Sequence, residues 1–123
     1  RDAQESRGLG DVYKRQSNDN PDYIIGTISL SHINRGSSPS ANMGYKIDRL
    51  NRGKGLASLM IAHMLDVVIP DLGIHRTECY IHPDNKISLH LMDKMSFIDE
   101  GIAHSYVKLN GKWQDHRRFV YIS

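Results

Sequence analysis

A glycine turn between an extended segment and a long amphipathic segment constrains this chain more than any other feature. Residues 41–47 read as a strand, and the residues after the turn place apolar side chains at helical spacing. Pro70 predicts the end of that helix, and residues 76–81 predict another short strand. A strand, a helix and a strand joined by short loops form a βαβ unit. We therefore expect two parallel strands linked by a right-handed crossover.

The apolar stripe of this helix is the evidence for its length. It covers about four turns and consists of Leu56, Leu59, Met60, Met64, Val67 and Val68. Ahead of the unit, residues 23–33 form a β-rich run. The sequence therefore places the βαβ unit beside at least one further strand.

The C-terminal third predicts one more helix and a hairpin. Asp84 or Asn85 can cap the helix, and residues 97–98 begin another strand. The apolar face of this helix is predicted to consist of Ile87, Leu91, Met92 and Met95. Residues 103–123 read as a hairpin with Asn110-Gly111 at its turn. The predicted fold class is α+β, with a mixed sheet, two flanking helices and a C-terminal β-hairpin.

Composition limits the chain to one ordinary domain. It has 123 residues, 39% hydrophobic and 24% charged, with a net charge of +2. That length allows one core and no second domain. No apolar run is long enough for a membrane span, and the mild positive charge does not indicate direct nucleic-acid binding. The single cysteine, Cys79, excludes an internal disulfide and fits a reducing cytoplasm, where we expect the protein to act.

Residues 1–16 differ from the rest of the chain. They lack an apolar period and lead into a turn cluster at residues 17–21. Residues 11–16 resemble the translated end of an adapter used to prepare sequencing libraries; an ordinary disordered tail is the alternative. We expect residues 1–16 to be a non-native or disordered leader, and residues 17–123 to be the domain.

The glycine turn itself favours an anion. Gly53 and Gly55 let the backbone turn tightly without a Cβ in the way. The N–H groups at the start of the following helix, with its dipole, favour a phosphate there. Such turns are common, so the turn alone does not identify the phosphate.

Four motifs in register resemble a known family. Arg52, Gly55 and Ala57 match the (Gln/Arg)-x-x-Gly-x-(Gly/Ala) signature of the Gcn5-related N-acetyltransferases (GNAT). The segments that follow in order are residues 82–88, 97–101 and 109–116, and the series resembles the branch that contains the ribosomal-protein-alanine acetyltransferases. The resemblance covers residues 24–122.

The resemblance implies a fold and a co-substrate. In this family two central parallel strands splay apart, and acetyl-CoA lies between them. Members usually carry a strand, two helices and another strand ahead of the region seen here. We therefore expect residues 17–123 to form a partial GNAT fold without its N-terminal elements, which normally form much of the acceptor wall.

The resemblance also implies site residues. The CoA pyrophosphate is expected on Arg52, Gly53, Lys54, Gly55, Leu56 and Ala57, mainly through backbone N–H groups. The strand before the turn, with Tyr45 and Ile47, is expected to bind the pantetheine arm through its backbone. Asn85 is expected to contact the pantetheine, and Ser88 to protonate the departing thiolate. Both could instead simply cap their helix.

The general base is not evident. Where many relatives have a glutamate, this chain has Asn42, and Glu100, His82 and Tyr106 are possible substitutes. An α-amine of pKa about 7.8 is about a quarter neutral at pH 7.4, against about 0.1% for a lysine near 10.4. An α-amine therefore needs a base less, and Asn42 mildly favours such an acceptor.

The function expected from these residues is acetyl transfer from acetyl-CoA to an amine by direct attack. The favoured acceptor is the N-terminal amine of a ribosomal protein. The alternatives are a small amine, such as an antibiotic or a polyamine, and a non-catalytic CoA-binding module. The seven histidines lack ligand spacing, so no metal site is expected, and Cys79 reads as an inert core thiol.

Overall fold

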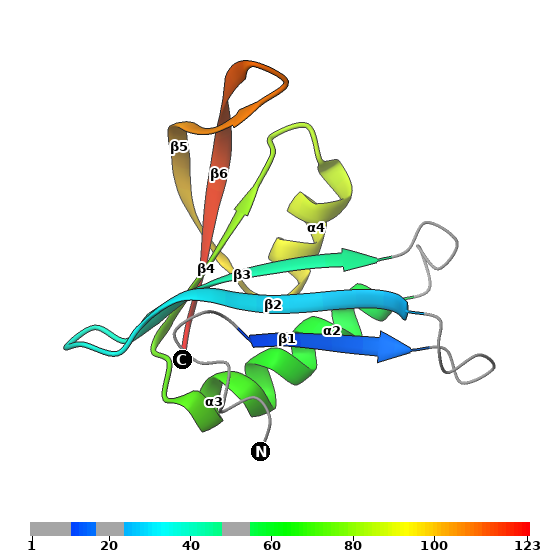
Figure 1. The fold of residues 1–123 in the computed structure, drawn as a ribbon, viewed down its shortest axis with the longest axis vertical. Coiled ribbons are helices and arrows are strands. Elements are labelled where there is room, and N and C mark those ends of the chain that lie inside the picture. The colour runs from blue at the N-terminus through cyan, green and yellow to red at the C-terminus, as the bar shows by residue number, and fades with distance from the viewer. Residues whose placement is uncertain (1–10, 17–23, 48–54) are drawn as a thin grey trace.

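One mixed sheet organises the chain. The computed structural model describes residues 11–16, 24–47 and 55–123. Six strands lie in the order β1-β2-β3-β4-β6-β5 (Figure 1). Their bounds are β1 Asp11–Gln16, β2 Ile24–Asn34, β3 Ser40–Ile47, β4 Arg76–Ile81, β5 Ile98–Leu109 and β6 Lys112–Ile122. The α+β class, the mixed sheet and the C-terminal hairpin are confirmed.

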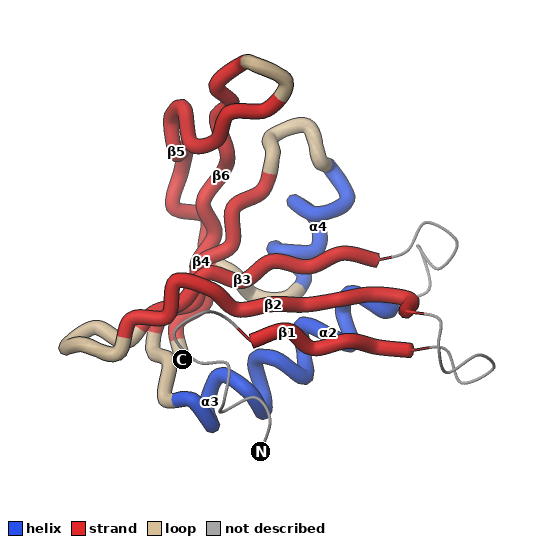
Figure 2. Tube along the Cα trace, in the orientation of Figure 1, coloured by secondary structure: helices blue, strands red, loops and turns tan. Residues whose placement is uncertain are grey.

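The two halves of the sheet meet at one short parallel contact. β3 and β4 pair in parallel through only three residue pairs, Ser40 with Arg76, Ala41 with Thr77 and Asn42 with Glu78. The other pairings, β1–β2, β2–β3, β4–β6 and β5–β6, are antiparallel. Beyond Asn42 the two parallel strands diverge, β3 toward the glycine turn and β4 toward the second helix (Figure 2). The predicted splay is therefore present, and it opens after Asn42.

β1 is a strand that the sequence did not predict. It lies inside the segment interpreted as a leader and pairs with β2 along residues 11–16. Its sequence lacks the apolar alternation of a half-buried strand, so no local pattern marks it. The edge of β2 supplies hydrogen-bonding partners instead. The pairing of β1 does not test the prediction that residues 1–16 are non-native.

The first helix continues past the proline that was expected to end it. It comprises α2 (Leu56–His63), the π-helical segment η2 (Met64–Val68) and α3 (Ile69–Leu72). Pro70 is the second residue of α3, the segment that directly follows η2. A proline removes one helical hydrogen bond and crowds the preceding turn, and the wider π turn accommodates both effects.

Gly73 ends this helix instead. Its φ is 71°, in the left-handed region that glycine adopts without strain. Its N–H donates to the carbonyl of Pro70, and the N–H of Ile74 donates to that of Ile69, both at 3.1 Å. This pair of bonds is the Schellman motif, in which the terminal carbonyls find partners inside the turn.

The side chains that this helix buries differ from the predicted stripe. Leu59 and Val67, both assigned to the apolar stripe, are exposed. The buried side chains recur in neighbouring pairs about every four residues: Met60 and Ile61, Met64 and Leu65, Val68 and Ile69, and then Leu72. Together these positions cover one side of the helix. The predicted stripe is therefore only partly right.

The second helix, α4 (Lys86–Lys94), begins at Asn85. Of the four side chains expected on its apolar face, Leu91 and Met92 are buried and Met95 packs partly against the core. Ile87 is exposed, so its assignment is wrong. The face that α4 buries includes Ser88 instead.

The core lies on one face of the sheet. Buried and partly exposed side chains alternate strictly along β4. Its Cys79 and Ile81 belong to the same buried cluster as side chains of α2, η2, α3 and α4. Arg76, Glu78 and Tyr80 point to the opposite face and remain partly exposed. We call the two sides the helix face and the open face.

Candidate active site

A hydrogen bond joins the two predicted site residues Tyr45 and Ser88 where the parallel strands separate. Tyr45 lies on β3 beyond the last β3–β4 pair, and Ser88 lies in the first turn of α4. The Tyr45 hydroxyl donates to Ser88 Oγ at 2.8 Å. Because the tyrosine proton is used in this bond, the serine hydroxyl hydrogen is left to donate elsewhere. The arrangement gives Ser88 the geometry of a proton donor.

Burial keeps the Tyr45 hydroxyl protonated. Ser88 is 9% exposed and Tyr45 is partly buried. Desolvation raises the pKa of Tyr45 above its usual value, and it outweighs the opposing effect of the bond to Ser88. Tyr45 therefore remains a phenol donor throughout the neutral pH range.

Asn85 acts as the cap of α4. Its Oδ1 accepts the backbone N–H of Ser88 at 3.2 Å. This is the structural alternative that the sequence left open, and it fixes the serine at the helix start. A pantetheine contact by the remaining amide group of Asn85 stays a prediction.

The glycine turn is described only from Gly55 onward; Arg52, Gly53 and Lys54 lie outside the described residues. Gly55 has a φ of 74° and precedes α2 without any side-chain cap. Leu56 and Ala57 form the first turn, whose N–H groups have no partner within the helix. This uncapped start fits the predicted pyrophosphate position.

None of the three substitutes considered for the general base belongs to the last β3–β4 pair, where the splay begins. Glu100 comes from β5 and forms ion pairs with Arg76 and Arg118. His82 lies beyond the end of β4 and accepts the N–H of Asp84 at 3.1 Å. Tyr106 stacks on Tyr80 of β4 with ring centroids 4.1 Å apart.

Glu78 is the carboxylate that the sequence analysis missed. It is the β4 partner of Asn42 in the last pair before the strands diverge. Its Oε2 accepts from Arg76 at 2.9 Å, and its Oε1 accepts from the Tyr80 hydroxyl at 2.7 Å. Burial disfavours its charge, but these hydrogen bonds and the arginine charges hold its pKa below the usual value. Only the strand register could have revealed it.

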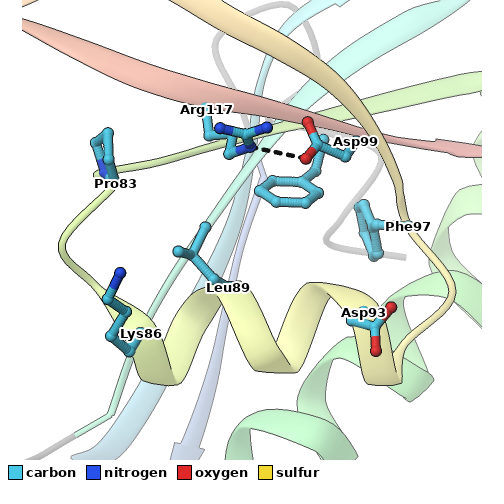
Figure 3. A pocket seen from close by; sticks show the side chains of 8 residues that line it. Pro83, Lys86, Leu89, Asp93, Phe97, Asp99 and Arg117 are labelled. Atoms are coloured by element: carbon cyan, nitrogen blue, oxygen red, sulfur yellow. Dashed lines mark hydrogen bonds and ion pairs between the residues drawn. The ribbon is translucent and has the colours of Figure 1, made fainter.

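A separate pocket lies on the other flank of α4. Its volume is about 560 Å³, and Figure 3 shows α4 below it and β5 and β6 above. Leu89, Phe97 and Phe119 give it an apolar lining. On the side formed by β5 and β6, the guanidinium of Arg117 donates to Asp99 at 2.7 Å. None of the predicted site residues lines this pocket, so we do not assign the chemistry to it.

Two other kinds of site receive no support from the described residues. Within residues 11–16, 24–47 and 55–123, no group of three or more His, Cys, Asp or Glu side chains could hold a metal ion. In the same residues, no helix is long and apolar enough to cross a membrane. Cys79 is buried, and burial raises the pKa of its thiol to about 12, which disfavours the reactive thiolate.

The family is shown by sequence as well as by fold. The model of the acetyltransferase (GNAT) domain matches residues 2–98. The chain therefore belongs to the GNAT acetyltransferase family, as its motifs, the splayed strands and the uncapped helix start indicate.

Relatives with different acceptors match this chain. The probable N-acetyltransferase YjcK of Bacillus subtilis is 38% identical over 96 residues, 78% of this chain and 53% of the relative. The ribosomal protein uS5-alanine N-acetyltransferase of Escherichia coli is 33% identical over 93 residues, 76% and 48%. The spermidine N(1)-acetyltransferase of Vibrio cholerae is 30% identical over 95 residues, 77% and 54%. The chain thus spans about half the length of these relatives.

A solved structure agrees with the fold. The ribosomal-protein-S5-alanine acetyltransferase of Vibrio fischeri superposes with a TM-score of 0.89 at 27% identity. The match covers 96% of this chain and 64% of that one. The resemblance to the family and to its ribosomal-protein-alanine members is therefore confirmed, without deciding the acceptor.

Proposed function

We propose that this protein transfers an acetyl group from acetyl-CoA to an amine, with the N-terminal α-amine of a ribosomal protein as the favoured acceptor. The observation that carries the proposal is the Tyr45–Ser88 pair beside the splay of β3 and β4. Family membership supplies the co-substrate, since GNAT acetyltransferases use acetyl-CoA.

The described residues fit the co-substrate. An extended pantetheine arm can add to the edge of β3 beyond Asn42, where the β4 ladder has ended. The N–H groups at the start of α2 suit the pyrophosphate, and Gly55 lets the backbone approach it. Tyr45 and Ile47 lie on this part of β3.

Ser88 is the proposed proton donor to the leaving CoA thiolate. When the carbon–sulfur bond breaks, the electron pair stays on sulfur and Ser88 donates its hydroxyl proton to the thiolate. Tyr45 stabilises the serine oxygen through the hydrogen bond that it already donates. Asn85 keeps the serine in place through the helix cap.

The charges on the open face support an acceptor with one amine. A polyamine carries several positive charges and is best held by unpaired carboxylates. Here Glu78 and Glu100 are balanced by Arg76 and Arg118. The spermidine acetyltransferase among the relatives keeps a small-amine acceptor as the second candidate. A non-catalytic module that binds CoA is the third.

Acetyl-CoA is expected to raise the melting temperature of the folded protein. Binding at 100 times Kd stabilises a protein by about 2.7 kcal/mol. Differential scanning fluorimetry measures the shift, and acetyl-pantetheine, which lacks the pyrophosphate, is expected to give a smaller one. A folded protein that acetyl-CoA does not stabilise would remove the co-substrate assignment.

We expect the enzyme to acetylate a peptide that has a free N-terminal alanine and an internal lysine. It is not expected to acetylate the same peptide when the N-terminus is blocked and only the lysine amine remains. The reason is the larger neutral fraction of an α-amine at neutral pH, about 300-fold above a lysine. Mass spectrometry locates the added acetyl group, and spermidine is assayed in parallel. Equal labelling of both peptides would contradict the α-amine assignment, and faster acetylation of spermidine would support the second candidate.

A further inference from the structure

A carboxylate and a hydroxyl lie near the start of the splay on opposite faces of the sheet. Ser88 approaches from the helix face, where it contacts Tyr45. Glu78 lies on the open face of β4, opposite Asn42 in the last pair of the parallel ladder. The splay therefore has a potential proton donor on its helix face and a potential proton acceptor on its open face.

The surroundings of Glu78 hold it as a carboxylate in one position. Arg76 and the hydroxyl of Tyr80 each donate to one of its oxygens, at 2.9 and 2.7 Å. Tyr80 is itself held by its stack on Tyr106. Each carboxylate oxygen has a second lone pair, so Glu78 can accept one more hydrogen bond. Its side chain is 22% exposed, which leaves it open to an acceptor that approaches this face.

We propose that Glu78 accepts the proton that the acceptor amine loses, in place of the glutamate that this chain lacks at Asn42. The inference rests on the proposed function. Many relatives carry the carboxylate on the strand that corresponds to β3, at the position of Asn42. The inference places it on the neighbouring strand β4, at the residue that pairs with Asn42 and therefore lies on the same face of the sheet.

The step balances as follows. The lone pair of the neutral amine forms the new carbon–nitrogen bond, and the carbonyl pair moves onto oxygen. The nitrogen is now positively charged, and its N–H is a stronger acid than a free ammonium. Glu78 takes this proton and becomes a carboxylic acid. The oxyanion then reforms the carbonyl, the carbon–sulfur bond breaks, and Ser88 protonates the sulfur. Solvent water then takes the proton from Glu78 and returns one to Ser88, so both groups end the cycle as they began it.

A low pKa suits this role. The hydrogen bonds that outweigh burial at Glu78 keep it ionised at neutral pH, so it is ready to accept. It does not need to deprotonate a free ammonium, because an α-amine of pKa about 7.8 already supplies the neutral form. The carboxylate has only to receive the proton released after attack.

The test is Glu78→Gln, assayed with acetyl-CoA and the peptide that begins with alanine. Glutamine keeps the size of the side chain and an oxygen for the Tyr80 bond. We expect kcat to fall about 100-fold, the lower range for a general base, with the thermal shift by acetyl-CoA unchanged. Glu78→Asp, which keeps a carboxylate, is expected to lose less.

Glu100→Gln is the matched control. It removes the other carboxylate bound to Arg76, but Glu100 comes from β5, two strands beyond β4 in the sheet. We expect kcat within about threefold of the wild type. An equal loss in both variants, or an unchanged kcat in Glu78→Gln, would overturn the role of Glu78 while leaving the proposed function intact. A wild-type protein that acetylates no α-amine would overturn both.

Discussion

Replacing Ser88 with alanine is expected to lower turnover about 100-fold, equivalent to about 2.7 kcal/mol of transition-state stabilisation. The thiolate would then leave without a proton donor. The helix should remain intact, because Asn85 bonds the backbone N–H of residue 88, which alanine retains. Steady-state kinetics with acetyl-CoA and an amine acceptor measure the loss, and circular dichroism verifies the fold.

Tyr45→Phe is the matched control for this prediction. It removes the same 2.8 Å hydrogen bond from the other side but leaves the serine hydroxyl in place. Both variants lose one partly buried hydrogen bond, so each is expected to lose about 1 kcal/mol of stability. Turnover should fall much less in Tyr45→Phe than in Ser88→Ala. Equal losses of turnover would contradict the assignment of Ser88 as the proton donor of the pair.

Much of the fold could be predicted because its signals are local. Asn110-Gly111 predicts the hairpin turn, and both residues have the positive φ that such a turn needs. The strand predicted at residues 76–81 corresponds to β4 without a shift. β1 could not be predicted, since its six residues are held by the edge of β2 rather than by a pattern of their own.

The site residues likewise divide into those that a local motif marks and those that only the folded structure brings together. A motif of adjacent residues marks Ser88 and Asn85, and the structure joins them through the helix cap. The partner of Ser88 is 43 residues away, and Tyr45 meets it only because β3 diverges from β4. Glu78 has no motif at all. Its place depends on the parallel register, which a single sequence does not specify.

The helix between the parallel strands offers the second large effect, Ile61→Ala. Ile61 is 0% exposed, on the part of α2 that packs into the core. Removing a buried isoleucine side chain to alanine costs about 2–5 kcal/mol, part of it from the cavity left behind. We expect chemical denaturation to show a loss of this size, and a lower yield of folded protein.

Leu59→Ala on the same helix is the matched control. Leu59 is 59% exposed, although the apolar period of the sequence assigns it to the buried stripe. Surface substitutions away from special features usually change stability by no more than about 0.5 kcal/mol. The stripe read from the sequence includes Leu59 and leaves out Ile61, so it predicts the opposite order. Comparing the denaturation midpoints of the two variants therefore tests which side of this helix packs into the core.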